Sequence, residues 1–371
     1  MVIAVDGNEA NVEKKVGVSV YTYELLRHFR SASSKELQFI IFLRQKPRFD
    51  LPKQSTFFKY HVVKGPFLWR NLFLPLALRK HGKLDVFFSP AHYTPPTCPA
   101  PVVVTIHDLA YIRYPEEFLK RDLYKLSRWT KEGVLQAKKV IAVSQSTKND
   151  LVYYFGTDEK KISVVHNGFS SKESRLHGES NVLEDLGVKK DQYILFAGTI
   201  QPRKNIQTLL HAFRLVLEER PQMKLVIVGK KGWLYDKIFQ IADELNLKNK
   251  AIFTDYIPNA DMAVLYNNTA VFVLPSLYEG FGLPVLEAMS HHAPVVASER
   301  SSLPEICGNA CLFFNPHSAV ELKEQIMQVI TSPKVRERLI REGQIQVKKF
   351  SWEKCAKETL TLLTAVAKHK S

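Results

Sequence analysis

The sequence contains few cysteines, and their spacing fits no metal site. Its 371 residues include only Cys98, Cys307, Cys311 and Cys355. No histidine pair adjoins Cys307 and Cys311, so the common zinc-binding patterns are excluded. We therefore expect reduced thiols in a cytoplasmic protein.

Long hydrophobic runs are missing as well. No run approaches the roughly 20 apolar residues that a helix needs to span a bilayer. The first six residues, MVIAVD, are typical of a buried strand rather than of a signal peptide. The sequence also lacks an Asp-x-Asp pair at the end of a predicted strand. Because such a pair would hold a divalent cation on a diphosphate, we expect no metal cofactor.

Basic residues outnumber acidic ones, and this excess is concentrated in the first half of the chain. The net charge is +15, and residues 1–180 hold 28 Lys and Arg against 17 Asp and Glu, whereas the rest holds 24 against 20. A basic first half indicates an anionic partner, such as nucleic acid, a membrane surface or a phosphorylated acceptor. No segment resembles a nucleic-acid-binding module, so an anionic membrane surface is favoured and no nucleic acid is expected.

The remaining composition is that of a globular α/β protein. Hydrophobic residues make up 45% of the chain and charged residues 24%, and the length predicts two domains. Strand-like apolar runs alternate with helical patterns, first from residue 2 and again from residue 193. Between these halves, residues 170–183 are rich in Ser, Glu and Lys without apolar periodicity, which is typical of a linker.

One stretch, residues 275–289, predicts a phosphate-binding turn. The apolar run 271–274 predicts a buried strand, Gly280 and Gly282 form a turn, and Pro284 falls in the first turn of a helix that begins near Leu283. A glycine-bordered helix N-terminus presents backbone N–H groups to a phosphate.

Two carboxylates frame this turn. Glu279 precedes it, and Glu287 lies a little over one turn into the predicted helix, so both would face one crevice. Carboxylates accept hydrogen bonds from sugar hydroxyls, which predicts a nucleotide-sugar site. The alternative is an ordinary strand-to-helix turn with both glutamates solvated, and the spacing alone does not separate the two.

Two further turns carry polar side chains. His107 and Asp108 follow the apolar run 102–106, at the strand end where ligands bind in an open α/β sheet. Arg203 and Lys204 precede a predicted helix and supply charge-assisted donors for a diphosphate. The alternatives are a structural histidine and a solvated charged turn.

Residues 66–80 form a strongly apolar segment with Arg70, Arg79 and Lys80 among them. The segment could lie in a membrane interface. We favour a buried core helix broken by Pro75, although periodicity cannot separate the two.

The residues from Glu279 to Glu287, with the intervening Gly280-Phe-Gly-Leu-Pro284, resemble the E-x7-E motif of retaining GT-B glycosyltransferases, glycosyltransferase family 4. The resemblance extends over nearly the whole chain. It implies two Rossmann-like domains facing across a cleft. Residues 1–170 would bind the acceptor, 171–185 link the domains, 186–350 bind the nucleotide-sugar, and 351–371 form a helix that crosses back to the first domain.

The resemblance also implies roles for single residues. Glu279 would contact the hydroxyls of the sugar, Glu287 those of the nucleotide ribose, and His107 the sugar or the donor phosphate. Arg203 and Lys204 would stabilise the charge of the leaving group. The remaining donor contacts would come from Gly17, Gly198, Gly229, Gly280, Phe281, Gly282 and Leu283. Relatives often carry an arginine at the position of Thr199, and Arg203 would substitute for it.

These roles together describe a retaining, metal-independent glycosyltransferase of cell-surface polysaccharide or lipopolysaccharide synthesis. The string Pro202-Arg-Lys-Asn205 is similar to one found in family members described as mannosyltransferases, and so favours GDP-mannose as donor. The acceptor would be a glycan or a lipid-linked sugar, and the protein would be cytoplasmic or peripheral on the inner face of a membrane. The alternatives are a GT-B sugar-nucleotide epimerase and a non-catalytic protein that binds an anionic ligand.

Overall fold

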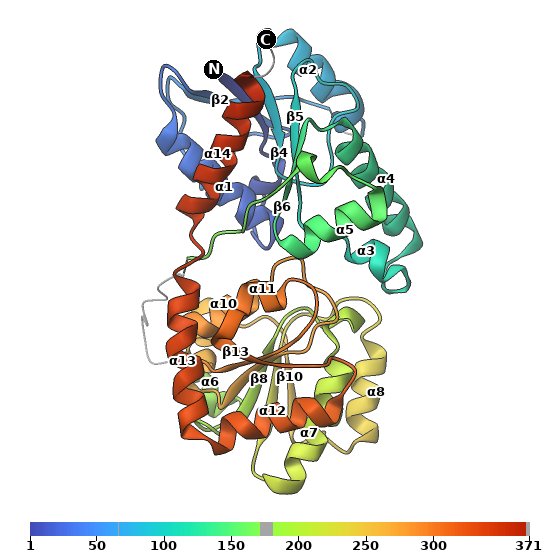
Figure 1. The fold of residues 1–371 in the computed structure, drawn as a ribbon, viewed down its shortest axis with the longest axis vertical. Helices are drawn as coiled ribbons and strands as arrows, with labels where there is room; N and C mark the ends of the chain where they lie inside the picture. Colours follow the sequence, from blue (N-terminus) through green and yellow to red (C-terminus); the bar gives the residue numbers. More distant parts are fainter. Residues whose placement is uncertain (66, 171–180, 369–371) are drawn as a thin grey trace. The chain divides into compact units, whose positions relative to one another are not determined.

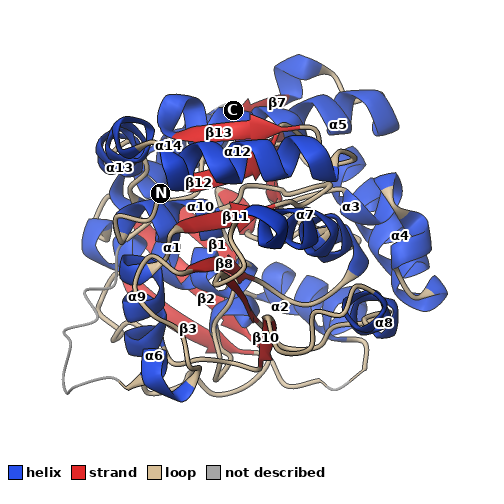
Figure 2. Cartoon of the chain, turned by 90° about the horizontal axis from the view of Figure 1, so that it is seen from below, coloured by secondary structure: helices blue, strands red, loops and turns tan. Residues whose placement is uncertain are grey.

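A computed structural model describes residues 1–65, 67–170 and 181–368. It divides into two compact units, of which the first comprises Met1–Gly168 with Phe350–Ser371 and the second Phe169–Lys349. Each unit is a parallel β-sheet with helices packed on it (Figures 1 and 2). The expected linker 171–185 falls partly on residues outside the described ones, and its last residues form a helix of the second unit.

The first unit contains a seven-stranded sheet in the order β3-β2-β1-β4-β5-β6-β7. Its strands are β1 Val2–Asp6, β2 Gln38–Leu43, β3 Phe58–Val62, β4 Val86–Ser89, β5 Val102–Ile106, β6 Lys139–Ala142 and β7 Ile162–Val164. Its helices are α1 Val18–Ala32, α2 Leu74–Lys80, α3 Ala110–Arg113, α4 Lys120–Gln136, α5 Gln145–Phe155 and α14 Trp352–Lys368. Short helical turns are η1 Asn8–Ala10, η2 Trp69–Phe73, η3 Pro115–Glu117 and η4 Glu159–Lys161.

The second unit contains a six-stranded sheet in the order β10-β9-β8-β11-β12-β13. Its strands are β8 Tyr193–Ala197, β9 Lys224–Val228, β10 Ala251–Thr254, β11 Val271–Leu274, β12 Val295–Ser298 and β13 Cys311–Phe314. Its helices are α6 Val182–Asp185, α7 Ile206–Glu219, α8 Asp236–Glu244, α9 Asn259–Asn268, α10 Leu283–Ser290, α11 Leu303–Cys307, α12 Ala319–Thr331 and α13 Pro333–Val347. Two short turns are η5 Pro202–Lys204 and η6 Gly308–Ala310.

The order of strands reverses its direction once in each sheet. In the first unit the reversal lies between β1 and β4, and in the second between β8 and β11. The inner strands are buried on both faces, which explains why their sequences are continuous apolar runs. Loops that leave adjacent strands at such a reversal diverge and open a crevice for ligands at the carboxyl ends.

The C-terminal helix α14 belongs to the first unit, in agreement with the expected helix that crosses back. It packs beside α1 (Figure 1), and its residues Trp352, Cys355, Leu363 and Val366 are part of the buried core of that unit. Gly168, at the end of the first segment, lies against Trp352 so closely that a Cβ atom would be 2.3 Å from the Trp352 backbone nitrogen. This contact ties the C-terminal helix to its own unit.

The prediction of a core helix is confirmed by the burial of one face, but the predicted break at Pro75 is wrong. Residues 69–73 form the π-helical turn η2, and α2 continues from it without a gap, with Pro75 as its second residue. Trp69, Leu74 and Leu78 are buried, whereas a second face is exposed. That exposed apolar face consists of Phe67, Leu68, Leu72 and Leu76.

Candidate functional site

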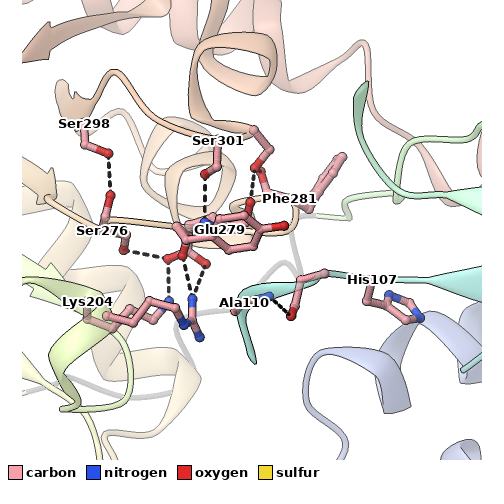
Figure 3. Close-up of polar contacts among 12 residues, drawn as sticks. His107, Ala110, Lys204, Ser276, Glu279, Phe281, Ser298 and Ser301 are labelled. Carbon is pink, nitrogen blue, oxygen red and sulfur yellow. Dashed lines mark hydrogen bonds and ion pairs between the residues drawn. The ribbon is translucent and has the colours of Figure 1, made fainter. Parts of the chain in front are cut away.

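The reversal in the second sheet holds a buried ionic cluster around Glu279 (Figure 3). The Lys204 ammonium donates to Glu279 Oε1 over 2.5 Å, and the Ser276 hydroxyl donates to the same oxygen over 2.6 Å. Arg203 Nη1 lies 3.8 Å from Glu279 Oε2 and donates to the Tyr278 carbonyl over 2.6 Å. The turn after β8 therefore binds the turn after β11 through three charged side chains.

Burial makes these charges depend on one another. Glu279 and Lys204 are each 8% exposed. Burial raises the pKa of the Glu279 carboxyl, but the charges of Lys204 and Arg203, with hydrogen bonds from Lys204 and Ser276, outweigh burial and lower it below its ordinary value. Glu279 is thus a carboxylate at neutral pH. The alternative of a solvated Arg-Lys turn does not fit this geometry.

A row of serines after β12 fixes the backbone of the Glu279 turn. Ser301 Oγ accepts from the Glu279 N–H over 2.8 Å, and Ser302 Oγ donates to the carbonyls of Glu279 and Phe281, both over 2.9 Å. The Ser298 hydroxyl donates to the Ser276 carbonyl. Sequence reasoning missed these residues. The only available signal was the density of serine between residues 298 and 302.

Asn205 was also missed as a structural residue. It adopts a left-handed conformation, with φ of 55°, at the junction of η5 and α7. Its side-chain amide donates to the carbonyls of Pro275, over 3.0 Å, and Pro316, over 2.8 Å. Asparagine tolerates this backbone conformation better than most residues. It therefore turns the chain and ties the Arg203-Lys204 turn to the strand end before Glu279.

Two predicted glycines are required by backbone geometry. Gly282 has a φ of 103° and precedes α10, which begins at Leu283 as predicted. Gly229 has a φ of 157°, and a Cβ atom there would lie 1.8 Å from the Gly198 carbonyl oxygen. The turns after β8 and β9 can therefore approach each other only because Gly229 has no side chain.

Glu287 and Glu279 lie in different surroundings. Glu287 is exposed on α10, and its Oε2 accepts from the Tyr266 hydroxyl over 3.3 Å. Phe281 is buried in the turn that separates the two glutamates, with Gly280 beside it. Glu279 is therefore part of the folded framework, whereas Glu287 is a surface group.

His107 and Gly17 belong to the first unit. His107 follows β5, and its Nε2 lies 2.8 Å from the Pro90 carbonyl, which can only accept, so this nitrogen carries a proton. Burial lowers the pKa of His107, although the Pro90 carbonyl and the Asp108 charge act in the opposite direction. Asp108 accepts from the Ala110 N–H over 3.1 Å and so orients the loop. Gly17, with φ of 52°, precedes α1.

Neither a spanning helix nor a metal cluster is found in the part of the chain that the structure describes. None of its helices there is long and apolar enough to cross a membrane. Likewise, no three histidine, cysteine or acidic residues of that part are grouped so that they could hold a metal ion.

Comparison with known proteins identifies both units. The family model described as Glycosyltransferase Family 4 matches residues 16–173, and that described as Glycosyl transferases group 1 matches residues 181–346. O-antigen chain mannosyltransferase B of Escherichia coli is 32% identical over 343 residues, which are 89% of this chain and 84% of that protein. Serotype-specific mannosyltransferase WbdA of Escherichia coli is 30% identical over 271 residues, 70% of this chain but only 32% of that longer protein.

Solved structures show the same fold. Sucrose-phosphate synthase from Thermosynechococcus elongatus superposes with a TM-score of 0.75 at 21% identity, over 98% of both chains. At this identity the likeness concerns the fold, two α/β units with parallel sheets. Together with the family models and the mannosyltransferase relatives, it shows that the chain is a glycosyltransferase enzyme of the GT-B fold and belongs to glycosyltransferase family 4.

Proposed function

We propose that the protein is a retaining, metal-independent mannosyltransferase that uses GDP-mannose. Its acceptor would be a glycan or a lipid-linked sugar in the synthesis of a cell-surface polysaccharide such as a lipopolysaccharide. The observation that carries the proposal is the buried cluster of Arg203, Lys204 and Glu279 at the carboxyl ends of β8 and β11. The name of O-antigen chain mannosyltransferase B supports the choice of sugar.

The cluster suits a diphosphate because its cations are held in place before any ligand binds. Arg203 Nε is buried and has no hydrogen-bond partner among the described residues, so it is a donor that a phosphate oxygen would satisfy. Lys204 adds a second positive charge beside it, and the N-terminus of α10 adds the positive end of a helix dipole. Donors positioned in advance stabilise the negative charge that develops on a leaving diphosphate.

Hydroxyl groups of the donor would form hydrogen bonds to the carboxylates. Glu279, ionised and fixed by its cations, would accept hydrogen bonds from sugar hydroxyls, and exposed Glu287 on α10 would accept from the ribose. In neutral His107 the proton lies on Nε2, so Nδ1 remains an acceptor for a hydroxyl of the transferred sugar.

The reaction would transfer the sugar with its anomeric configuration kept. The acceptor oxygen forms a bond to the anomeric carbon while the bond from that carbon to the diphosphate oxygen breaks. The proton of the acceptor hydroxyl passes to the diphosphate, which leaves as GDP. The cationic side chains of Arg203 and Lys204 compensate the charge that this group gains.

We further propose that the first unit works at the inner, anionic surface of a membrane. The exposed apolar face of Phe67, Leu68, Leu72 and Leu76 is followed by exposed Arg79 and Lys80. Apolar side chains bordered by cations match the headgroup region of an anionic bilayer. A lipid-linked acceptor would be present at the same surface.

The first experiment is a thermal-shift series with GDP, UDP, dTDP and ADP, each in EDTA. A ligand that binds only the folded state raises the melting temperature by mass action, and we expect GDP alone to do so. The Arg203→Ala substitution should remove most of this shift. Arg214→Ala is the matched control, because Arg214 pairs with Glu218 on α7 outside the cluster.

Transfer is then followed with GDP-mannose and a lipid-linked acceptor, and the product anomer is determined by NMR. Transfer in EDTA with an α-linked product supports the proposal. If UDP instead of GDP raises the melting temperature, the proposed donor is wrong. If transfer requires a metal ion, the cluster does not have the proposed role. If GDP-mannose is converted into another sugar nucleotide without an acceptor, the protein is an epimerase.

A further inference from the structure

The first unit contains a pocket of about 490 Å³ that the donor cluster does not use. All its lining residues belong to that unit. Those that carry the argument are Arg44, Gln45, Trp69, Arg70, Tyr93 and Trp129. The volume lies within the range of roughly 300–1,000 Å³ that is common for sites of small organic ligands.

The pocket lies where the first sheet reverses its strand order. Arg44 and Gln45 follow β2 directly, Asn8 follows β1, and Tyr93 follows β4. Asn8 joins two of these loops, since its Oδ1 accepts from the Arg44 N–H over 2.8 Å and its amide donates to Asp6 over 2.7 Å. Loops at the carboxyl ends beside a reversal are the usual place for a ligand in an open α/β sheet.

Aromatic rings supply a large part of the wall. Trp69 is 6% exposed, and its indole N–H is already bonded to the Val63 carbonyl over 2.8 Å, so the ring is held in place. Tyr93 and Trp129 meet edge to face, with ring centroids 6.1 Å apart and planes at 71°. Rigid aromatic surfaces pack against the C–H faces of a sugar ring, and the Gln45 amide is suited to its hydroxyls.

The charge of the pocket is positive. Arg44 and Arg70 line it, and no aspartate or glutamate does so among the described residues. The Arg70 guanidinium lies 5.3 Å from the Trp129 ring centroid, and its Nη2 donates to Glu132 over 2.7 Å. Its Nε and Nη1 are buried and have no hydrogen-bond partner within the described part of the chain. Buried donors of a cation without acceptors are unfavourable, and a small rotation toward a bound anion would satisfy them.

We propose that this pocket is the acceptor site and that it binds a hexose carrying a phosphate or diphosphate at its anomeric oxygen. The sugar ring would pack between Trp69 and Trp129, and the phosphate would lie against Arg70 and Arg44. The assignment of the ligand as acceptor rests on the proposed transferase function. The same chemistry is offered by a free sugar phosphate and by the headgroup of a lipid-linked sugar diphosphate.

The test is calorimetric titration of the full-length protein with N-acetylglucosamine 1-phosphate, with N-acetylglucosamine and with inorganic phosphate. We expect the phosphorylated sugar to bind at least tenfold more tightly than either part alone. Arg70→Gln and Trp129→Leu should each weaken its binding about tenfold or more, and Arg70→Lys should restore part of the loss. Thermal melts of each variant confirm that it folds.

Arg128→Gln is the matched control. Arg128 and Arg70 both donate to Glu132, but only Arg70 lines the pocket, so the control loses a contact to the same carboxylate without altering the wall. The affinity of this variant for the phosphorylated sugar should stay within twofold of that of the unaltered protein. The proposal is overturned if Arg70→Gln and Arg128→Gln behave alike, or if the sugar binds as well without its phosphate.

The source of the ligand and the transferase function are tested separately. The lipid-linked source is supported if a short polyprenyl diphosphate N-acetylglucosamine in detergent binds more tightly than the sugar phosphate, with the same dependence on Arg70. Equal affinity of the two ligands supports the free sugar phosphate as the source. GDP-induced stabilisation should be unchanged in Arg70→Gln. If GDP does not stabilise the unaltered protein, the donor assignment alone is refuted. If GDP stabilises it but the sugar phosphate does not bind, the assignment of the pocket alone is refuted.

Discussion

Glu279 shows how a single buried carboxylate holds two turns of the chain. It accepts from Lys204 and Ser276 on one oxygen and faces Arg203 on the other. Removing one partner of such a pair leaves a buried charge uncompensated, whereas removing both is much less unfavourable. The cluster therefore contributes to the stability of the fold, in addition to its proposed role in ligand binding.

This asymmetry gives a prediction for Lys204. Lys204→Met should lower the free energy of unfolding by about 3–5 kcal/mol, because Glu279 would remain buried with its main partner gone. The double variant Lys204→Met/Glu279→Gln should regain a substantial part of that loss. Urea denaturation of the three proteins measures both values.

An exposed ion pair serves as the control. Arg214 and Glu218 form an i,i+4 pair on α7 with side chains about half exposed, and Arg214→Met should change stability by less than ~0.5 kcal/mol. If Lys204→Met has an equally small effect, the charges of the cluster are not coupled as described.

The buried carboxyl group of Asp6 predicts that the stability of the protein depends on pH. Burial raises the pKa of this carboxyl from 3.8 to about 7, against the lowering effect of hydrogen bonds from Asn8. A raised pKa means that the folded protein binds the proton more tightly than the unfolded chain. The resulting stability is fully present below pH 3.8 and is lost as the pH rises through about 7. Relative to Asp6→Asn, the unaltered protein should thus become less stable between pH 4 and 7.

Urea denaturation of both proteins across this range measures the difference. The difference should level off above pH 7, where the carboxyl is ionised in both states. A difference that stays constant from pH 4 to pH 8 would show that Asp6 does not titrate as described.

At the scale of elements, the strand–turn–helix units were readable from the sequence. The buried run of β11, Gly282 and Pro284 together predicted the start of α10 at Leu283, because each is a local signal. The ion pair between Lys204 and Glu279 could not be predicted in the same way. It depends on β8 lying beside β11, and strand order is set by packing between segments far apart in the sequence.

The serines after β12 and the course of residues 67–80 were missed for a related reason. Ser301 and Ser302 act on a loop that leaves the neighbouring strand, so their role needs the register of β11 with β12. The segment from η2 to α2 is apolar on two faces, and nothing in its composition tells which face is buried. The residues of the proposed acceptor pocket, such as Trp129, carry no motif.

The contact between Gly168 and α14 gives a prediction at this scale. Gly168→Ala should lower the melting temperature by several degrees, because the new methyl group would lie 2.3 Å from the Trp352 backbone nitrogen and 2.4 Å from its Cα. Adding Trp352→Ala should not restore the loss, because it removes only the contact with the Trp352 ring, at 2.5 Å, and leaves the two closer contacts with main-chain atoms. Differential scanning calorimetry of the single and double variants decides this, and recovery in the double variant would contradict the geometry.

For the whole molecule, the uneven charge predicts binding to anionic surfaces. Positions 1–180 contain 28 basic and 17 acidic residues, so binding to vesicles that contain anionic phospholipid should be strong at low salt. It should fall steeply above about 0.3 M salt, and neutral vesicles should bind weakly. Co-sedimentation measures this dependence.

The exposed apolar face should contribute to the same binding. Leu72→Gln with Leu76→Gln should reduce binding to anionic vesicles several-fold, because both side chains are about half exposed and would enter the interface. Exposed Val320→Gln on α12, in the second unit, is the control and should bind as before. Equal loss in the control would show that no particular face contacts the lipid.

The return of the last helix to the first unit affects how the protein can be made. The core of that unit includes Trp352 and Leu363, which are synthesised only after all of residues 169–349. On the ribosome, the second unit can therefore fold completely while the first still has one face of its core uncovered. The first unit is therefore completed last, and we expect its uncovered apolar surface to bind chaperones until then.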